Sequence, residues 1–158
     1  MRTWLIAPMI AALVGLLPST RTAAQSGGLE DLSAFPRATL EIVTAAHKQL
    51  HYDVWVADTP RREQKGLMFV HDLPASQGML FPENPPRATS MWMKNTLIEL
   101  DMVFIGPDHR ILKITPRAVP QSLETIASGG AVVAVLELRG GEAEKQGLRR
   151  GDEVRWKQ

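Results

Sequence analysis

The feature that most constrains the fold is a period-two pattern of apolar side chains at residues 50–57. Every second side chain from Leu50 to Val56 is apolar, and His51 and Asp53 lie between them. Successive side chains of a strand point to opposite faces of a sheet, whereas a helix repeats every 3.6 residues. The spacing therefore predicts a β-strand that is buried on one face.

Other segments also have the pattern of strands. Residues 102–105 and 111–115 predict a hairpin, because Gly106-Pro107-Asp108-His109 between them has the composition of a turn. Residues 131–138 are apolar on both faces, as expected for a strand in the middle of a sheet. Shorter strands are expected at residues 40–42 and 153–156.

Two short helices fit between these strands. Thr59 can cap a helix at residues 60–65, because proline suits the first helical turn and Gly66 suits the exit. Residues 142–146, followed by glycine, repeat this pattern, and residues 122–127 are a third candidate. With 11 prolines and 12 glycines, the chain is expected to be mainly β, a sandwich or barrel with two or three short helices.

The first 24 residues have the pattern of a secretory signal peptide. After a basic start, residues 4–17 are apolar apart from a glycine and a proline, and Thr22-Ala23-Ala24 offers small residues for cleavage after Ala24. The apolar stretch is shorter than the roughly 20 residues that span a bilayer, which favours cleavage over a retained anchor. We therefore expect a secreted or periplasmic protein without stable membrane insertion after cleavage, with a flexible leader at residues 25–37 and a single β-rich domain at 38–157.

Charge and cysteine content exclude several classes of function. Cleavage would remove Arg2 and Arg21, leaving 16 basic and 17 acidic residues, so no basic surface is implied and nucleic acid is not an expected partner. The chain has no cysteine, which excludes disulfides, thiolate metal sites and a cysteine nucleophile. Stability must come from the core, and a mature chain of 134 residues is long enough to bury one.

Chemically distinctive residues are concentrated between Gly66 and Asp101. This segment holds four of the five methionines that follow Met1 and Met9, together with a tryptophan, an amide and a carboxylate. Such a density indicates either a pocket or a tightly packed core.

Motifs spread over residues 50–156 carry a family resemblance. In order they are Arg62 with Gly66-Leu67-Met68, Gly78-Met79-Leu80-Phe81, Trp92-Met93-Lys94-Asn95-Thr96, Leu100-Asp101, Phe104, Pro120, Leu136-Glu137-Leu138, Gly140 or Gly141, and Gly151-Asp152. With these motifs the chain resembles the domain of unknown function 192 family. The resemblance implies a β-sandwich similar to a jelly roll and, often, export. No activity is established for the family, so the resemblance brings no catalytic residues. Where the family usually has a basic residue after Gly-Leu-Met-Phe, this chain has Val70 and then His71, which leaves an anion-binding role there without support.

Trp92 and Asn95 suggest a ligand site. Tryptophan offers a flat apolar face and asparagine offers both a donor and an acceptor, which suits a sugar or a peptide. The alternative is a turn, because asparagine tolerates a left-handed backbone. Our preferred hypothesis is non-catalytic binding of an unknown small-molecule or peptide ligand, small or extended, without a cofactor or metal. Its candidate site residues are Trp92, Met93, Asn95, Asp101, Glu137 and Arg62.

Two carboxylates lie in apolar strand sequences and support a competing hypothesis. Asp101 begins one such strand, and Glu137 shares a face with two valines in another. A buried carboxylate must find a partner or change its pKa, and two facing carboxylates could hydrolyse a glycoside. The structural alternative pairs Glu137 with Arg62 or Lys94, and lets Asp101 accept backbone N–H bonds from the turn at residues 94–96.

The methionines support a third hypothesis, a copper-binding periplasmic protein. Thioether sulfur binds Cu(I), and a neighbouring tryptophan can cover the metal. The alternative is that methionine fills gaps in the core, which suits a strand at residues 91–93 because its two methionines face away from the tryptophan. The copper candidates are Met68, Met79, Met91, Met93, Trp92 and His71.

The remaining motifs are weak or absent. Residues 141–154 are similar to the helix–loop–strand segment of PDZ domains, but no carboxylate-binding loop precedes a second strand, and such a segment is also generic. The chain has no His-Glu-x-x-His and no Gly-x-Ser-x-Gly sequence, so a zinc hydrolase and a serine hydrolase of these types are unsupported.

Overall fold

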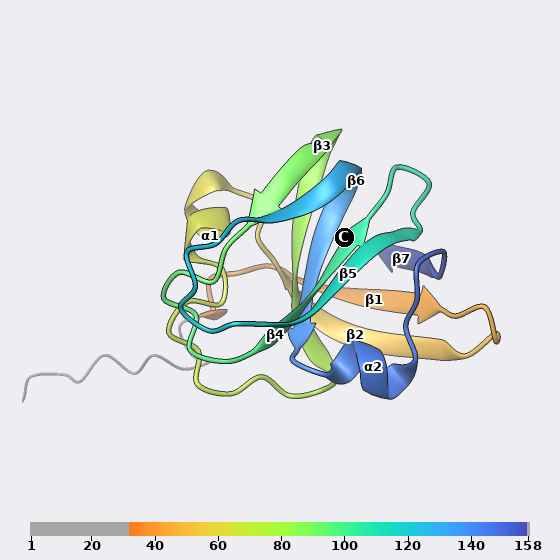
Figure 1. Ribbon diagram of the computed structural model, residues 1–158, viewed down its shortest axis with the longest axis horizontal. Helices are drawn as coiled ribbons and strands as arrows, with labels where there is room; N and C mark the ends of the chain where they lie inside the picture. Colours follow the sequence, from red (N-terminus) through yellow and green to blue (C-terminus); the bar gives the residue numbers. More distant parts are fainter. Residues whose placement is uncertain (1–31, 158) are drawn as a thin grey trace, which may run out of the picture.

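The computed structural model describes residues 32–157, and within them one seven-stranded sheet dominates the fold (Figure 1). The expected signal peptide and residues 25–31 lie outside the described residues. The strand order is β5-β4-β6-β3-β2-β1-β7. The elements are β1 (Arg37–Val43), β2 (Gln49–Val56), α1 (Pro60–Lys65), β3 (Gln77–Met91), β4 (Leu100–Ile105), β5 (Ile111–Ala118), β6 (Ile126–Arg139), α2 (Glu142–Gln146) and β7 (Glu153–Lys157).

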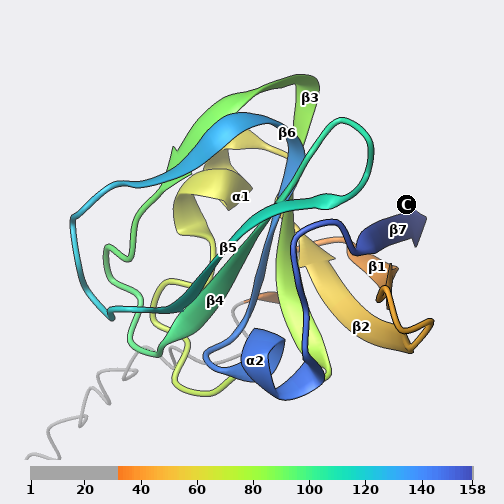
Figure 2. The ribbon, with the colours of Figure 1, turned by 45° about the vertical axis from the view of Figure 1, so that its right-hand side comes forward.

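The sheet is mixed and strongly curved. Its neighbouring strands are antiparallel except for β2 and β3, which run parallel and are joined by a crossover that contains α1. The two edge strands approach each other at one end, where the Ile111 N–H donates to Asp152 O (2.9 Å) and the Val154 N–H donates to His109 O (2.8 Å) (Figure 2). These bonds do not close the ladder into a barrel, so the fold is an open, barrel-like sheet.

Side chains from the two faces of the sheet form two separate cores. One cluster takes residues from all seven strands, among them Leu40, Val54 and Leu136, and is extended by Ala143 of α2. The other cluster lies on the opposite face, where Met79 and Met102 pack with the segment that follows α1. The crossover covers this second face mainly with the segment after α1, where Leu67, Val70 and Leu73 are buried. The helix α1 itself has no buried residues.

The strands and two of the helices agree with the sequence predictions. The Thr59 hydroxyl accepts a hydrogen bond from the Arg62 N–H (3.4 Å) at the start of α1, and Gly66 ends the helix with φ of 46°. The helix predicted at residues 122–127 is wrong. Ile126 pairs with Met91 as β6 begins, because strand pairing there overrides a weak local helical preference.

The segment before β1 packs against the domain. Leu32 is fully buried and Phe35 is 7% exposed, although the sequence placed both in the flexible leader. The Arg62 guanidinium donates to Ala34 O (2.8 Å), which fastens this segment to α1. Among residues 32–157, no helix has the length and apolar character needed to cross a membrane.

Candidate functional site

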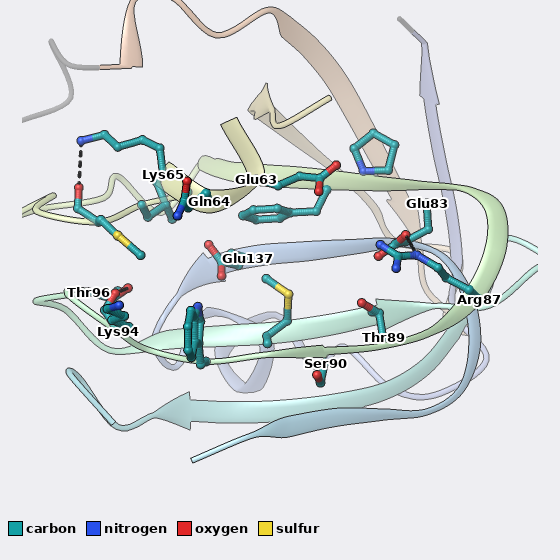
Figure 3. A pocket seen from close by; sticks show the side chains of 17 residues that line it. Glu63, Gln64, Lys65, Glu83, Arg87, Thr89, Ser90, Lys94, Thr96 and Glu137 are labelled. Atoms are coloured by element: carbon teal, nitrogen blue, oxygen red, sulfur yellow. Dashed lines mark hydrogen bonds and ion pairs between the residues drawn. The ribbon is translucent and has the colours of Figure 1, made fainter. Parts of the chain in front are cut away.

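A pocket of about 220 Å³ opens between α1 and the second half of β3 (Figure 3). Glu63, Gln64 and Lys65 line it from the helix side, and Thr89 and Ser90 line it from the strand side. In both ribbon views α1 lies beside the long curved pair formed by β3 and β6. The pocket exists because the crossover from β2 to β3 carries α1 over this face of the sheet.

Glu137 of β6 points into this pocket between its two walls. Its cross-strand neighbours are Met79 and Met102, and the residue is 4% exposed. Its Oε2 is buried without a hydrogen-bond partner among the described residues. Burial raises the pKa of the Glu137 carboxyl to about 8, because an ionised carboxylate would lose its hydration without gaining a partner. Near neutral pH this carboxyl is therefore mostly protonated and can donate a hydrogen bond.

Trp92 and two lysines lie at one end of the pocket. Trp92 is 51% exposed, and the Lys94 Nζ lies 5.3 Å from the centre of its ring. Lys65 donates from its Nζ to Met68 O (3.2 Å) and lies 5.5 Å from the Phe69 ring. This end of the pocket thus combines the exposed ring of Trp92 with ammonium groups.

At the other end of the pocket, the Arg87 Nε donates to a carboxylate oxygen of Glu83 (Figure 3). The two charges offset each other there.

Trp92 and Glu137 are the two predicted site residues that the structure brings together. Met93 is fully buried in the core and does not line the pocket. Asn95 adopts the left-handed backbone of a turn, with φ of 56°, and its carbonyl accepts the Phe69 N–H (2.9 Å). Asn95 therefore holds the loop beside the pocket, as the turn alternative anticipated.

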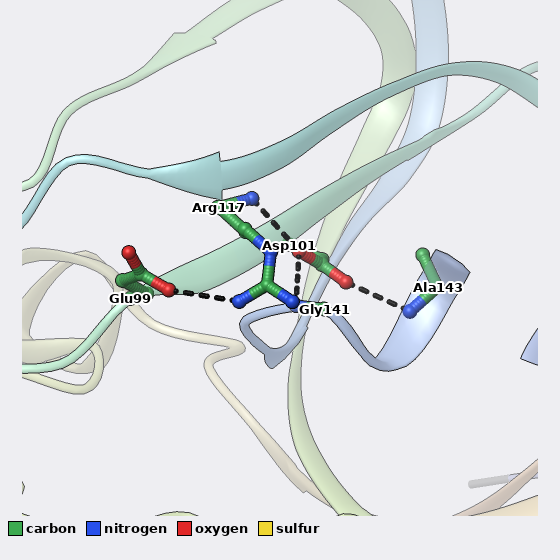
Figure 4. A network of polar contacts seen from close by, with 5 residues as sticks. All are labelled: Glu99, Asp101, Arg117, Gly141 and Ala143. Carbon is green, nitrogen blue, oxygen red and sulfur yellow. Dashed lines mark hydrogen bonds and ion pairs between the residues drawn. The ribbon is translucent and has the colours of Figure 1, made fainter. Parts of the chain in front are cut away.

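Asp101 lies elsewhere and has its own set of partners (Figure 4). Its Oδ1 accepts the backbone N–H groups of Arg117 (2.8 Å) and Gly141 (2.9 Å), and its Oδ2 accepts that of Ala143 (2.7 Å). Asp101 thus joins β4, β5 and the start of α2. It accepts backbone bonds as the structural alternative supposed, but not from the turn at residues 94–96.

The strand register separates Asp101 from Glu137. Asp101 pairs with Leu138, whereas Glu137 pairs with Met102, so the two carboxyl groups point to opposite faces of the sheet. Burial raises the pKa of the Tyr52 phenol, with contributions from Glu142 and Asp101, which places Asp101 on the Tyr52 side. The facing pair of carboxylates required by the hydrolase hypothesis is therefore not formed by these two residues.

Arg62 is used in holding the chain around α1. Its guanidinium forms an ion pair with Asp58 (2.6 Å) and lines a different hollow, together with Phe35 and Arg61. Within the described part of the chain, neither Arg62 nor Lys94 forms an ion pair with Glu137.

The candidate copper ligands are divided between core and pocket. Met79 and Met93 are fully buried in the core, whereas Met68 and Met91 line the pocket. His71 is exposed and does not line the pocket. Residues 32–157 contain no group of three or more His, Asp or Glu side chains placed to hold a metal.

The sequence analysis missed the polar side chains of α1 and of the second half of β3. The sequence did predict the helix at residues 60–65 between two strands. Because those strands are parallel in the structure, the connection that contains the helix must cross one face of the sheet. Only the strand register shows that this is the face that carries Glu137. The missed lining residues with polar side chains are Glu63, Gln64, Lys65, Glu83, Arg87, Thr89 and Ser90.

The fold and pocket define a curved mixed β-sheet protein with a helix-covered polar pocket. The chain belongs to the domain of unknown function 192 family, DUF192, described as "Uncharacterized ACR, COG1430", whose profile matches residues 41–156. The comparison with curated proteins gives no match.

Two solved structures are similar to the chain. One is a protein from Sinorhizobium meliloti 1021 described as a candidate transcription regulator, with 34% identity and a TM-score of 0.75, covering 77% of this chain and 95% of that one. The other is a protein of unknown function from Novosphingobium aromaticivorans DSM 12444, with 35% identity and a TM-score of 0.76, covering 78% and 88%. Both likenesses agree with the family assignment.

Proposed function

We propose that this protein is an exported, non-catalytic binder of a small ligand, which it holds in the pocket between α1 and β3. The observation that carries the proposal is that Glu137 lines an open pocket while its buried Oε2 has no hydrogen-bond partner within residues 32–157. A buried polar atom left in this state costs free energy that a ligand group can recover. A concave site with a few convergent polar groups and a perturbed pKa is the usual form of a ligand site.

Binding is favoured over hydrolysis by the position of Asp101. Its carboxylate oxygens accept three backbone bonds on the other face of the sheet, so it is not available as a second group beside Glu137. The Sinorhizobium meliloti neighbour is described as a candidate transcription regulator, a class of protein that often binds DNA. The near-zero net charge of the present chain gives no support to nucleic-acid binding here.

Trp92 provides a direct test of occupancy. Titration with a panel of sugars, amino acids, dipeptides and diamines is expected to change the tryptophan emission for at least one compound, because Trp92 is half exposed and lines the pocket. The response should disappear in Trp92→Phe. It should persist in the control variant Trp156→Phe, because Trp156 packs against His109 and does not line this pocket. If no compound changes either the emission or the melting temperature, the proposed function is wrong.

Export gives a separate prediction. Expressed with its own N-terminus in a Gram-negative host, the protein should be recovered from the periplasm or medium with Gln25 as its first residue, because Thr22-Ala23-Ala24 offers the small residues of a cleavage site. Intact-mass measurement of the fractionated material decides this. Full-length protein confined to the cytoplasm would contradict export and leave the pocket unaffected.

A further inference from the structure

We propose that the ligand is a neutral sugar, seated with one ring face on Trp92 and with a hydroxyl or ring oxygen accepting a hydrogen bond from Glu137. This inference rests on the proposed function, since it names the class of molecule that the same pocket binds.

The apolar part of the lining suits a sugar ring. A pyranose has one face rich in C–H groups, which packs on a flat aromatic side chain. Trp92 is 51% exposed at the pocket mouth, and Lys94 can cover at most one face of its ring. A cavity of about 220 Å³ is small, which favours a ligand of one or two rings over a long polymer segment.

The polar part of the lining both donates and accepts hydrogen bonds. Glu137 points into the pocket, and its Oε2 has no hydrogen-bond partner in the described part of the chain. Gln64 offers an amide that both donates and accepts. Thr89 adds a hydroxyl-bearing side chain from the facing wall (Figure 3). Sugar hydroxyls also donate and accept, so such a mixed lining matches them better than it matches a purely donating ammonium group.

The charges that face the pocket disfavour a cationic ligand. Glu63 and Lys65 come from α1, Glu83 and Arg87 from β3, and Lys94 from the loop after it. Glu83 and Arg87 pair with each other. Besides Glu137, the lining as a whole has two acidic and three basic side chains. The cross-strand neighbours of Glu137 are methionines and add no charge. An amine ligand would therefore meet no excess of negative charge.

The test is isothermal titration calorimetry with defined probes. The sugars are glucose, galactose, N-acetylglucosamine, cellobiose and N,N′-diacetylchitobiose, and the charged probes are 1,5-diaminopentane and glutarate. At least one sugar should bind, and more tightly than either charged probe. Its affinity should fall about tenfold or more in Glu137→Ala, because one buried hydrogen bond is lost, but less than about threefold in Glu137→Gln, whose amide still donates. The exposed Glu144→Gln of α2 is the matched control and should leave affinity unchanged.

The pH dependence adds a second readout. Raising the pH from 6.5 to 9.5 should weaken sugar binding in the wild type, because an ionised Glu137 cannot donate, and this change should vanish in Glu137→Gln. If the Glu137 variants fail to fold by circular dichroism, Gln64→Ala and Thr89→Ala replace them, since both side chains line the pocket and their loss should weaken binding several-fold.

The outcomes separate this inference from the function on which it rests. If only the diamine or the dicarboxylate binds, with loss in Trp92→Phe, the pocket is a ligand site but the ligand is not a neutral sugar. If sugars bind equally well to Glu137→Ala, the assigned role of Glu137 is wrong. If no probe of either panel binds, the sugar assignment fails, and the fluorescence panel decides whether pocket binding fails with it.

Discussion

Replacing Asp101 with alanine is expected to lower the free energy of unfolding by about 3–6 kcal/mol. The change removes the acceptor for the backbone N–H groups of Arg117, Gly141 and Ala143. A donor left without an acceptor costs about 1–3 kcal/mol, and the two part-buried donors, of Arg117 and Gly141, are expected near the lower end of that range. Because these three groups come from β5 and from both sides of the start of α2, the loss also loosens how α2 is held against the sheet. Urea denaturation followed by circular dichroism measures it.

Two variants make the Asp101 result specific. Asp101→Asn keeps one carbonyl acceptor and should lose less than the alanine variant. Asp53→Ala removes an exposed carboxylate of β2 and should change stability by less than about 0.5 kcal/mol. A loss below about 1 kcal/mol in Asp101→Ala would show that water or rearranged partners replace the carboxylate, and its role in joining β4, β5 and α2 would be refuted.

Alternation and turn chemistry were sufficient to predict most of the sheet. The pattern at residues 50–57 places Tyr52 and Val54 in one core and leaves His51 and Asp53 exposed, as observed in β2. The turn at Gly106 joins β4 and β5 as expected. These features are local, because side-chain period and glycine conformations do not depend on which strands pair. The failed helix at residues 122–127 reflects the opposite case, in which the partner strand decides the conformation.

The candidate site depended on register, which a single sequence does not contain. In the sequence, Asp101 and Glu137 are both carboxylates within apolar strands. In the structure Glu137 pairs with Met102, the residue after Asp101, so the two carboxylates lie on opposite faces of the sheet. Asp101 is satisfied by backbone donors that lie 16 to 42 residues away in the sequence. Among residues 32–157, no side chain of α1 or of the sheet forms a hydrogen bond with the buried Oε2 of Glu137. Local patterns identify such carboxylates but cannot tell which of them is satisfied.

Replacing Glu137 with glutamine is expected to remove a large part of the pH dependence of stability. The folded protein holds a proton on Glu137 up to a pKa of about 8, whereas the unfolded chain releases it near 4.5. Between these values the folded state binds one more proton than the unfolded state, so this group makes stability fall as pH rises, by about 1.4 kcal/mol per pH unit. Below pH 4.5 and above pH 8 its contribution is flat. Denaturant unfolding of both proteins from pH 5 to pH 9 measures the difference.

The glutamine variant should be close to the wild type in stability at pH 5 and a few kcal/mol more stable at pH 9, because it cannot acquire a buried, unpartnered charge. The control variant Glu144→Gln changes an exposed residue of α2, and its free energy of unfolding should vary with pH as that of the wild type does. Parallel curves for Glu137→Gln would mean that the carboxyl finds a partner when it ionises. Curves of unfolding free energy that diverge between the wild type and Glu137→Gln as pH rises would show that Glu137 lowers stability at neutral and basic pH. Such a cost at a pocket-lining residue would support the proposed ligand-binding role of Glu137, since a glutamine at the same place would carry no such penalty.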